Sequence, residues 1–190
     1  MRKRHQLVLF TGMLAGLMTG SAAGQAIRVA RSQAVSPDTA VGSMTVTASP
    51  SSVSFRLVSR GVAPGSSAVN ITTTWGGSLC LLSCTINLYA YFSGANAALS
   101  GGGSPAVSIP ASAVLGQVPT GSPTSFTAFT QSNPLGGAGA SLLLFQQSFF
   151  LITGGGSRTD SLSLEINLAS QPQLPAGSYT GTLYIQAQSL

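Results

Sequence analysis

Few side chains in this sequence could carry out chemistry, and the two cysteines are the first to consider. Cys80 and Cys84 are separated by three residues. In a straight strand their Cα atoms would lie about 13 Å apart, beyond the roughly 4.4–6.8 Å that a disulfide spans. A bridge therefore requires a turn through Leu81–Ser83. In a secreted protein we expect that local disulfide, because redox and zinc chemistry would need another cysteine spacing or further ligands.

The acidic residues form no pair suited to carboxylate catalysis. The chain has three, namely Asp38, Asp160 and Glu165. Asp160 and Glu165 are five positions apart, which places them on opposite faces of one strand, and we interpret Asp160 as a turn residue near Arg158. Glycoside hydrolysis needs two facing carboxyl groups, and three scattered acids do not predict a dedicated calcium site.

The amino-terminal residues are typical of a secretory signal peptide. Arg2–Arg4 precede an apolar run, Leu7–Gly20, and small residues follow. The run is shorter than the roughly 20 residues that span a bilayer as a helix, so we expect no stable membrane span. We assign residues 1–26 to the signal peptide, with an uncleaved anchor as the alternative. Three cleavage positions are open: after Ala23, after Gly24 and after Ala26.

Cleavage would change the charge and the reactive groups of the chain. It would remove Lys3 and His5, the only lysine and the only histidine. Five arginines and three acidic residues would remain, a formal net charge of +2 that predicts no nucleic-acid partner. A Ser or Thr nucleophile would lack a side-chain base. We therefore expect no enzyme, no metal and no cofactor.

The rest of the chain predicts an all-β fold. Residues 27–42 lack periodicity and are interpreted as a flexible leader, and residues 43–190 as one domain. Within it, short runs of period-two alternation are separated by Gly, Pro and Ser clusters. We predict a single immunoglobulin-like antiparallel β-sandwich of about 8–9 strands. The expected strands are Met44–Ala48, Val53–Ser59, Ala68–Trp75, Thr85–Phe92, Ala106–Ile109, Ser125–Phe129, Leu142–Ile152, Ser161–Leu168 and Tyr179–Gln188.

The last two predicted strands alternate most regularly. In Tyr179–Gln188, Leu183 and Ile185 are expected to face the core, while the intervening residues form a wet face. Ser161–Leu168 has the same pattern, so the two strands are expected to pair antiparallel. Pro175 and Gly177 predict a turn before the last strand.

Three tyrosines are the candidate ligand-binding residues. Alternation in Thr85–Phe92 turns Tyr89 and Tyr91 away from the core, and Tyr184 lies on the corresponding face of the last strand. Aromatic rings on an open sheet face can stack on sugar rings while their hydroxyls stay hydrated. The alternative is ordinary packing between neighbouring strands.

The run Leu142–Ile152 is apolar on both strand faces. We interpret it as a central strand that is covered on both sides. The alternative is an edge that awaits a neighbouring subunit, which would lead to self-association.

Two families resemble parts of the chain. The segments Ser49–Phe55, Gly65–Ile71 with Trp75, and Pro175–Leu183 resemble secreted bacterial immunoglobulin-like modules of the BACON type. The ending Gly177–Thr182 also looks like the closing strand of chaperone-assembled fimbrial subunits. The first resemblance implies a module of secreted and surface proteins that binds carbohydrate or mucin, or acts as a spacer. We therefore expect an extracellular, cell-surface or periplasmic module whose partners are polysaccharide or other surface proteins. The second implies a structural subunit that assembles by strand exchange.

Overall fold

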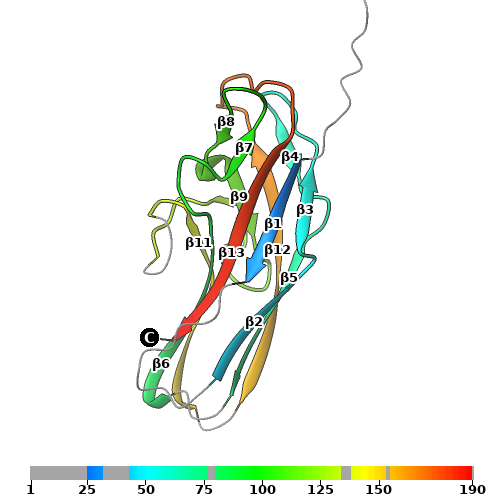
Figure 1. The fold of residues 1–190 in the computed structure, drawn as a ribbon. Helices are drawn as coiled ribbons and strands as arrows, with labels where there is room; N and C mark the ends of the chain where they lie inside the picture. Colours follow the sequence, from blue (N-terminus) through cyan, green and yellow to red (C-terminus); the bar gives the residue numbers. More distant parts are fainter. Residues whose placement is uncertain (1–24, 32–42, 77–79, 134–137, 153–154, 190) are drawn as a thin grey trace, which may run out of the picture.

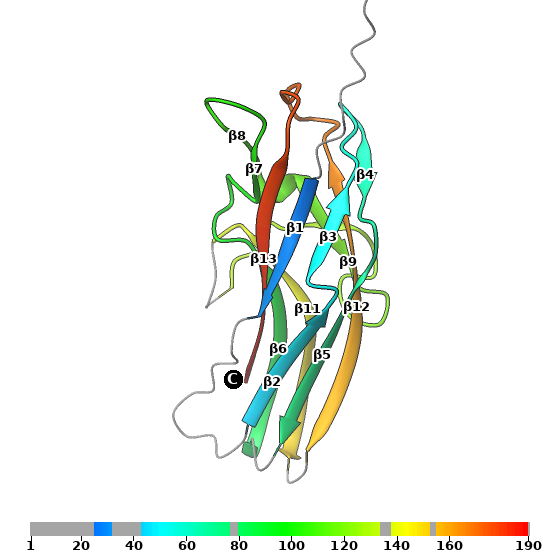
Figure 2. The same cartoon turned by 45° about the vertical axis from the view of Figure 1, so that its right-hand side comes forward.

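The protein is a β-sandwich in a computed structural model that describes residues 25–31, 43–76, 80–133, 138–152 and 155–189. Two sheets pack face to face along an elongated body (Figures 1 and 2). The only helical element in these ranges is a single 3-10 turn, η1 (Ala111–Ala113). The predicted all-β sandwich is therefore confirmed.

The first sheet has seven strands and contains both the first and the last strand of the described chain. Its main order is β11-β6-β13-β1-β3, and β7 and β8 extend it beside β13. The pair β1 and β13 is parallel, whereas a purely antiparallel sandwich was predicted. The bounds are β1 Gln25–Arg31, β3 Ser52–Phe55, β6 Cys80–Tyr91, β7 Leu99–Gly101, β8 Val107–Ile109, β11 Ser141–Ile152 and β13 Tyr179–Ser189.

The second sheet has six strands and is built around β12. Its main order is β10-β9-β12-β5-β2, and β4 also pairs with β12. The long strand β12 pairs with β5 through its first half and with β9 and β4 through its second half. The bounds are β2 Ser43–Ser49, β4 Val62–Pro64, β5 Val69–Gly76, β9 Val114–Gln117, β10 Thr127–Ala128 and β12 Gly156–Asn167.

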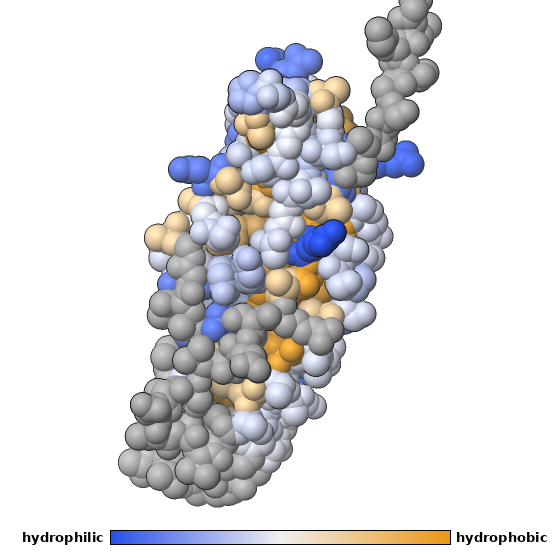
Figure 3. Space-filling view, viewed as in Figure 1, coloured by the Kyte–Doolittle hydropathy of each residue, from blue (hydrophilic) through white to orange (hydrophobic). Residues whose placement is uncertain are grey.

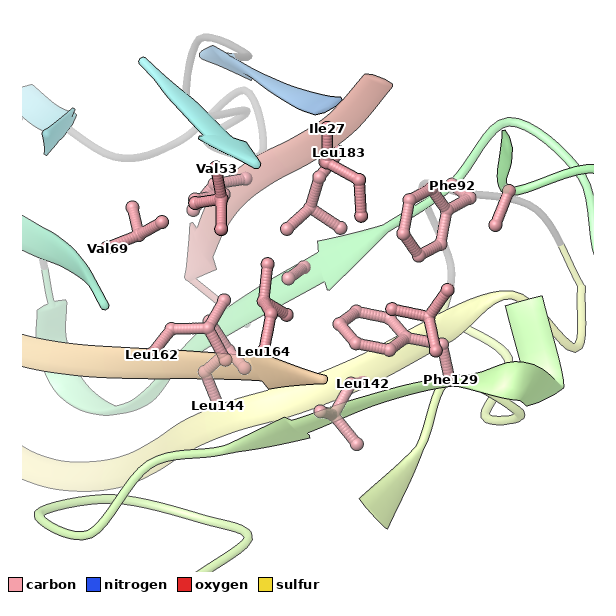
Figure 4. Close-up of a cluster of buried hydrophobic side chains, with 14 of the residues drawn as sticks. Ile27, Val53, Val69, Phe92, Phe129, Leu142, Leu144, Leu162, Leu164 and Leu183 are labelled. Carbon is pink, nitrogen blue, oxygen red and sulfur yellow. The ribbon is translucent and has the colours of Figure 1, made fainter. Parts of the chain in front are cut away.

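The core lies between the two sheets. Leu183 of β13 and Ile27 of β1 face Leu162 and Leu164 of β12 across it (Figure 4). All four side chains are buried, and the rings of Phe92 and Phe129 meet edge to face with their centroids 5.1 Å apart. Removing this much apolar surface from water is the main stabilising contribution to such a fold.

The predicted pairing of the last two long strands is wrong. β12 and β13 belong to different sheets and face each other across the core. Both strands carry one apolar face, and alternation identifies that face without saying whether the partner lies beside the strand or opposite it. The apolar residues Leu183 and Ile185 are buried, as predicted.

The predicted flexible leader is wrong for its first five residues. Residues 27–31 belong to β1, which lies between β13 and β3, and Ile27 is completely buried. Residues 32–42, and residues 1–24 of the predicted signal peptide, lie outside the described ranges. Because Gln25 and Ala26 pair with Phe55 and Ser54, cleavage after Ala23 or Gly24 would leave β1 complete.

The predicted central position of the run Leu142–Ile152 is also wrong, because β11 is the last strand of its sheet. Part of its outer edge is satisfied by the loops before and after β10. The Ser122 amide donates to the Leu144 carbonyl (2.8 Å), and the Leu143 amide donates to Gln131 Oε1 (2.7 Å). Farther along, Gln146 is exposed. Edge protection thus comes from loop contacts and polar residues, neither of which the apolar run itself reveals.

The turn predicted before the last strand is present. Gly177 has a φ of 153°, and the Tyr179 hydroxyl donates to the Pro175 carbonyl at 2.9 Å. Gly102, with φ 81°, passes so close that a Cβ there would lie 2.0 Å from the Tyr179 hydroxyl oxygen. The start of β13 is therefore locked onto the β7 end of the sheet.

Candidate functional site

The three candidate tyrosines lie together on the outer face of the first sheet. Tyr91 of β6 is the register partner of Tyr184 of β13. Their rings stack with centroids 5.4 Å apart and planes 21° apart. Tyr89 lies on the same face, two residues before Tyr91, and is the register partner of Gln186. Alternation alone predicted the shared face, but only the pairing of β6 with β13 shows that two rings meet.

A glutamine completes this cluster, which we call the tyrosine face (Tyr89, Tyr91, Tyr184 and Gln186). The Tyr91 hydroxyl donates to Gln186 Oε1 at 3.1 Å. All three tyrosines are half-buried, so each ring keeps some exposed surface. The contacts hold the rings in place and leave part of their surface available to a ligand.

The rest of this outer face is less exposed to solvent than predicted. Thr180 is exposed, as expected, but Gln186 and Gln188 are buried. Gln188 is the register partner of Asn87, which is also buried. Neither Gln188 Nε2 nor Asn87 Oδ1 has a hydrogen-bond partner among the residues that the structure describes. Alternation shows which residues share a face and contains no information on what covers it.

An arginine that the sequence reasoning placed in the leader also belongs to this face. Arg28 of β1 is exposed and is the register partner of Thr182, two residues before Tyr184. Figure 3 shows this side of the sandwich, where hydrophilic and apolar patches alternate over β13 and β1. The signal that could have identified β1 is its short period-two run, in which Ile27 and Val29 alternate with Arg28.

The strongest electrostatic contacts lie elsewhere, on the inward face of β12. Asp160 is fully buried inside the strand and is not the predicted turn residue. Its carboxylate accepts from Arg158 Nε at 2.8 and 3.0 Å and from Thr120 Oγ1 at 3.2 Å. The Arg158 guanidinium lies 4.8 Å from the ring centroid of Phe145 and also donates to the Thr120 carbonyl.

This cluster has the features of a structural contact. The hydrogen bonds that Arg158 donates to Asp160, together with the negative charge of Asp160, raise the pKa of Arg158, whereas burial acts to lower it. Both carboxylate oxygens of Asp160 are engaged by one arginine. The cluster therefore fastens the loop that contains Thr120 to the strand and offers no free acid for catalysis.

The predicted disulfide remains a prediction. The backbone of Cys80 and Cys84 lies in β6, opposite Ile152 and Phe149 of β11, with a register irregularity between Phe150 and Ile152. The side chains of both cysteines lie outside the described part of the structure. Leu81–Ser83 lie within the strand β6, so the turn on which this bridge was expected to depend is absent from the backbone.

Among the described residues, no group of three or more His, Cys, Asp and Glu side chains could hold a metal ion. Within the same residues, no helix is long and apolar enough to cross a membrane.

Fold and site together define an all-β sandwich with an aromatic and polar cluster on one sheet face. No protein-family model matches the chain, and no curated protein is significantly similar to it.

Proposed function

We propose that the chain is a secreted, non-enzymatic module of the cell surface or extracellular space whose tyrosine face binds carbohydrate. The observation that carries the proposal is the stacked pair Tyr91 and Tyr184, held beside Gln186 on an outer sheet face. Tyr89 and the exposed Arg28 extend the same face.

The chemistry of this face suits a sugar chain. The apolar faces of sugar rings pack against aromatic rings, and their hydroxyls bond to amides and to tyrosine hydroxyls. The face is part of a hydrogen-bonded sheet, so the rings need little reorganisation on binding. An extended polysaccharide would contact several of these groups at once.

The test is retention of the secreted protein in gels that contain soluble polysaccharides of different composition. Tyr89→Ala should abolish the retardation with little change in melting temperature, because Tyr89 is outside the stacked pair. Tyr91→Phe should weaken retardation less, since the ring stays. Phe126→Ala, which changes an aromatic residue that is 39% exposed, is the matched control. Unchanged retardation of Tyr89→Ala would refute the proposal.

A second function is favoured by one observation, the position of β1. This strand is the first of the described chain, it pairs with both β13 and β3, and it supplies the buried Ile27. An identical strand from another copy could make the same contacts, as in domain swapping. The chain would then be a fimbrial-type subunit that self-associates by strand exchange.

Competition by a peptide tests this second function. Oligomers that form in concentrated protein should be reduced by an excess of a synthetic peptide of the sequence Gln25–Arg31. The same peptide with Ile27→Asp should have no effect, because it cannot fill the core position. A protein that stays monomeric in light scattering at every concentration, and after refolding at high concentration, would exclude strand exchange.

A further inference from the structure

A small cavity opens at the end of the sandwich where β13 begins. Its volume is about 190 Å³. The walls come from the start of β1, the turn after β3 and the connection between β12 and β13. The lining combines apolar side chains, among them Leu57, Leu168, Leu174 and Pro172, with polar groups such as Gln25 and with one charged residue, Arg60.

The backbone of Arg60 has an unusual conformation. Its φ is 54°, and among the described residues it is the only one other than glycine with a positive φ. It lies in a tight turn that is closed by a hydrogen bond from the Gly61 amide to the Val58 carbonyl, 3.0 Å long. Glycine or asparagine fits this region at lower cost, so stability alone does not explain a long cationic side chain here.

The charge of Arg60 is also unpaired. Arg60 is exposed and makes no ion pair or hydrogen bond with any residue that the structure describes. Arg158, by contrast, is held by Asp160. A guanidinium at a cavity wall with no carboxylate of the protein beside it can bind an anionic group of a ligand.

Two other polar groups of the lining are already engaged. Gln25 Oε1 accepts from the Leu57 amide at 3.3 Å, and the Tyr179 hydroxyl donates to the Pro175 carbonyl at 2.9 Å. Arg60 is therefore the lining group best able to orient a ligand. Leucine and proline side chains line the same cavity, so the ligand should carry one negative group on a compact body with apolar carbon for them to cover.

We propose that this cavity binds a small apolar carboxylic acid, with the Arg60 guanidinium bonded to the carboxylate and the leucine and proline side chains covering the apolar part. A volume of about 190 Å³ is below the roughly 300–1,000 Å³ of pockets for drug-sized ligands, which limits the ligand to a small acid. The site is separate from the tyrosine face, and its ligand class differs from carbohydrate.

Benzoate and isovalerate are suitable probes, with benzamide as the uncharged counterpart of benzoate. Titration of the secreted protein, followed by amide chemical shifts in NMR, should show saturable binding of at least one acid with a Kd below about 10 mM. The shifts should centre on the cavity lining. Benzamide should bind at least about tenfold more weakly than benzoate, because it has no charge for the guanidinium.

Arg60→Gln should weaken binding of the acid at least about tenfold. Arg56→Gln removes the same charge from an exposed residue outside this cavity and should leave the affinity unchanged. Arg60→Gly should abolish binding while raising the melting temperature by about 2 °C, because it relieves the backbone strain. That variant stays informative if Arg60→Gln folds poorly.

Three results would overturn the proposal. They are no saturable binding of either acid to the wild-type protein, equal affinity for benzoate and benzamide, and equal loss of affinity in Arg56→Gln and Arg60→Gln. The last result would mean that only the net charge of the protein matters.

Discussion

At the residue scale, Asp160 shows how the interior of a protein with little charge accommodates an ion pair. A fully buried carboxylate is costly unless it is paired and hydrogen-bonded, and here Arg158 and Thr120 satisfy it. Arg158 remains 30% exposed, so only one partner of the pair is completely removed from water. Breaking the pair would leave the guanidinium without its anion.

We predict that Asp160→Asn lowers the free energy of unfolding by about 2–4 kcal/mol. The measurement is urea denaturation near neutral pH. Glu165→Gln, a change of the half-buried acid on the opposite face of β12, should stay within about 0.5 kcal/mol of the wild type. Equal effects of both substitutions would mean that the buried pair contributes nothing specific.

Tyr179 gives a prediction about pH. Burial raises the pKa of its hydroxyl above the ordinary value of 10.0. The folded state then holds this proton more tightly than the unfolded state does, so the stability from this group is complete below pH 10 and is lost as the pH rises further. In Tyr179→Phe, this part of the loss of stability at alkaline pH should be absent.

The same substitution removes the hydrogen bond to Pro175, so at neutral pH Tyr179→Phe should cost about 1 kcal/mol. Melting temperatures of both proteins between about pH 8 and pH 11 would test both statements. If the melting temperature of the variant falls with rising pH as steeply as that of the wild type, other groups control the stability at alkaline pH.

At the element scale, β13 tests the register on which the sheet assignment depends. Leu183 is completely buried and its neighbour Tyr184 is half-buried on the other face. Leu183→Asp would place a charge in the core and should unfold the domain. Tyr184→Ser should cost only about 1–2 kcal/mol, from the loss of the stacked ring. Circular dichroism at room temperature distinguishes the two, and a folded Leu183→Asp would disprove the register.

Most strands were predictable, and three of the four that were missed are short. Each of the nine predicted strands overlaps a strand of the structure. The sequence reasoning missed β1, β4, β7 and β9, and the last three have only three or four residues each. So few residues contain one or two alternations, which is too little signal to separate a strand from a loop. The segment Ala111–Leu115, where one helical turn was conceivable, contains η1 and the start of β9.

At the scale of the whole molecule, β1 joins the amino-terminal end of the described chain to its carboxyl-terminal strand. A flexible leader would tolerate any substitution, whereas a core strand would not. We predict that Ile27→Ala lowers the free energy of unfolding by about 2–5 kcal/mol, because it leaves a cavity between β13 and β3. Arg28→Ala, at the exposed neighbouring position, is the control and should change it by less than about 0.5 kcal/mol. Denaturant unfolding of both variants decides the matter, and a tolerated Ile27→Ala would restore the leader interpretation.

The amino-acid sequence by itself determined the all-β class, the turn before β13 and the residues that share a face. These properties depend on neighbours along the chain, since alternation and turn chemistry act over a few residues. Tertiary structure decided that β12 and β13 face each other, that β11 is an edge and that β1 enters the sheet. It also brought Tyr91 to Tyr184 and placed Arg60 at a cavity, without an ion pair to any described residue. Such contacts join residues far apart in the sequence, and one periodic pattern is compatible with several partners.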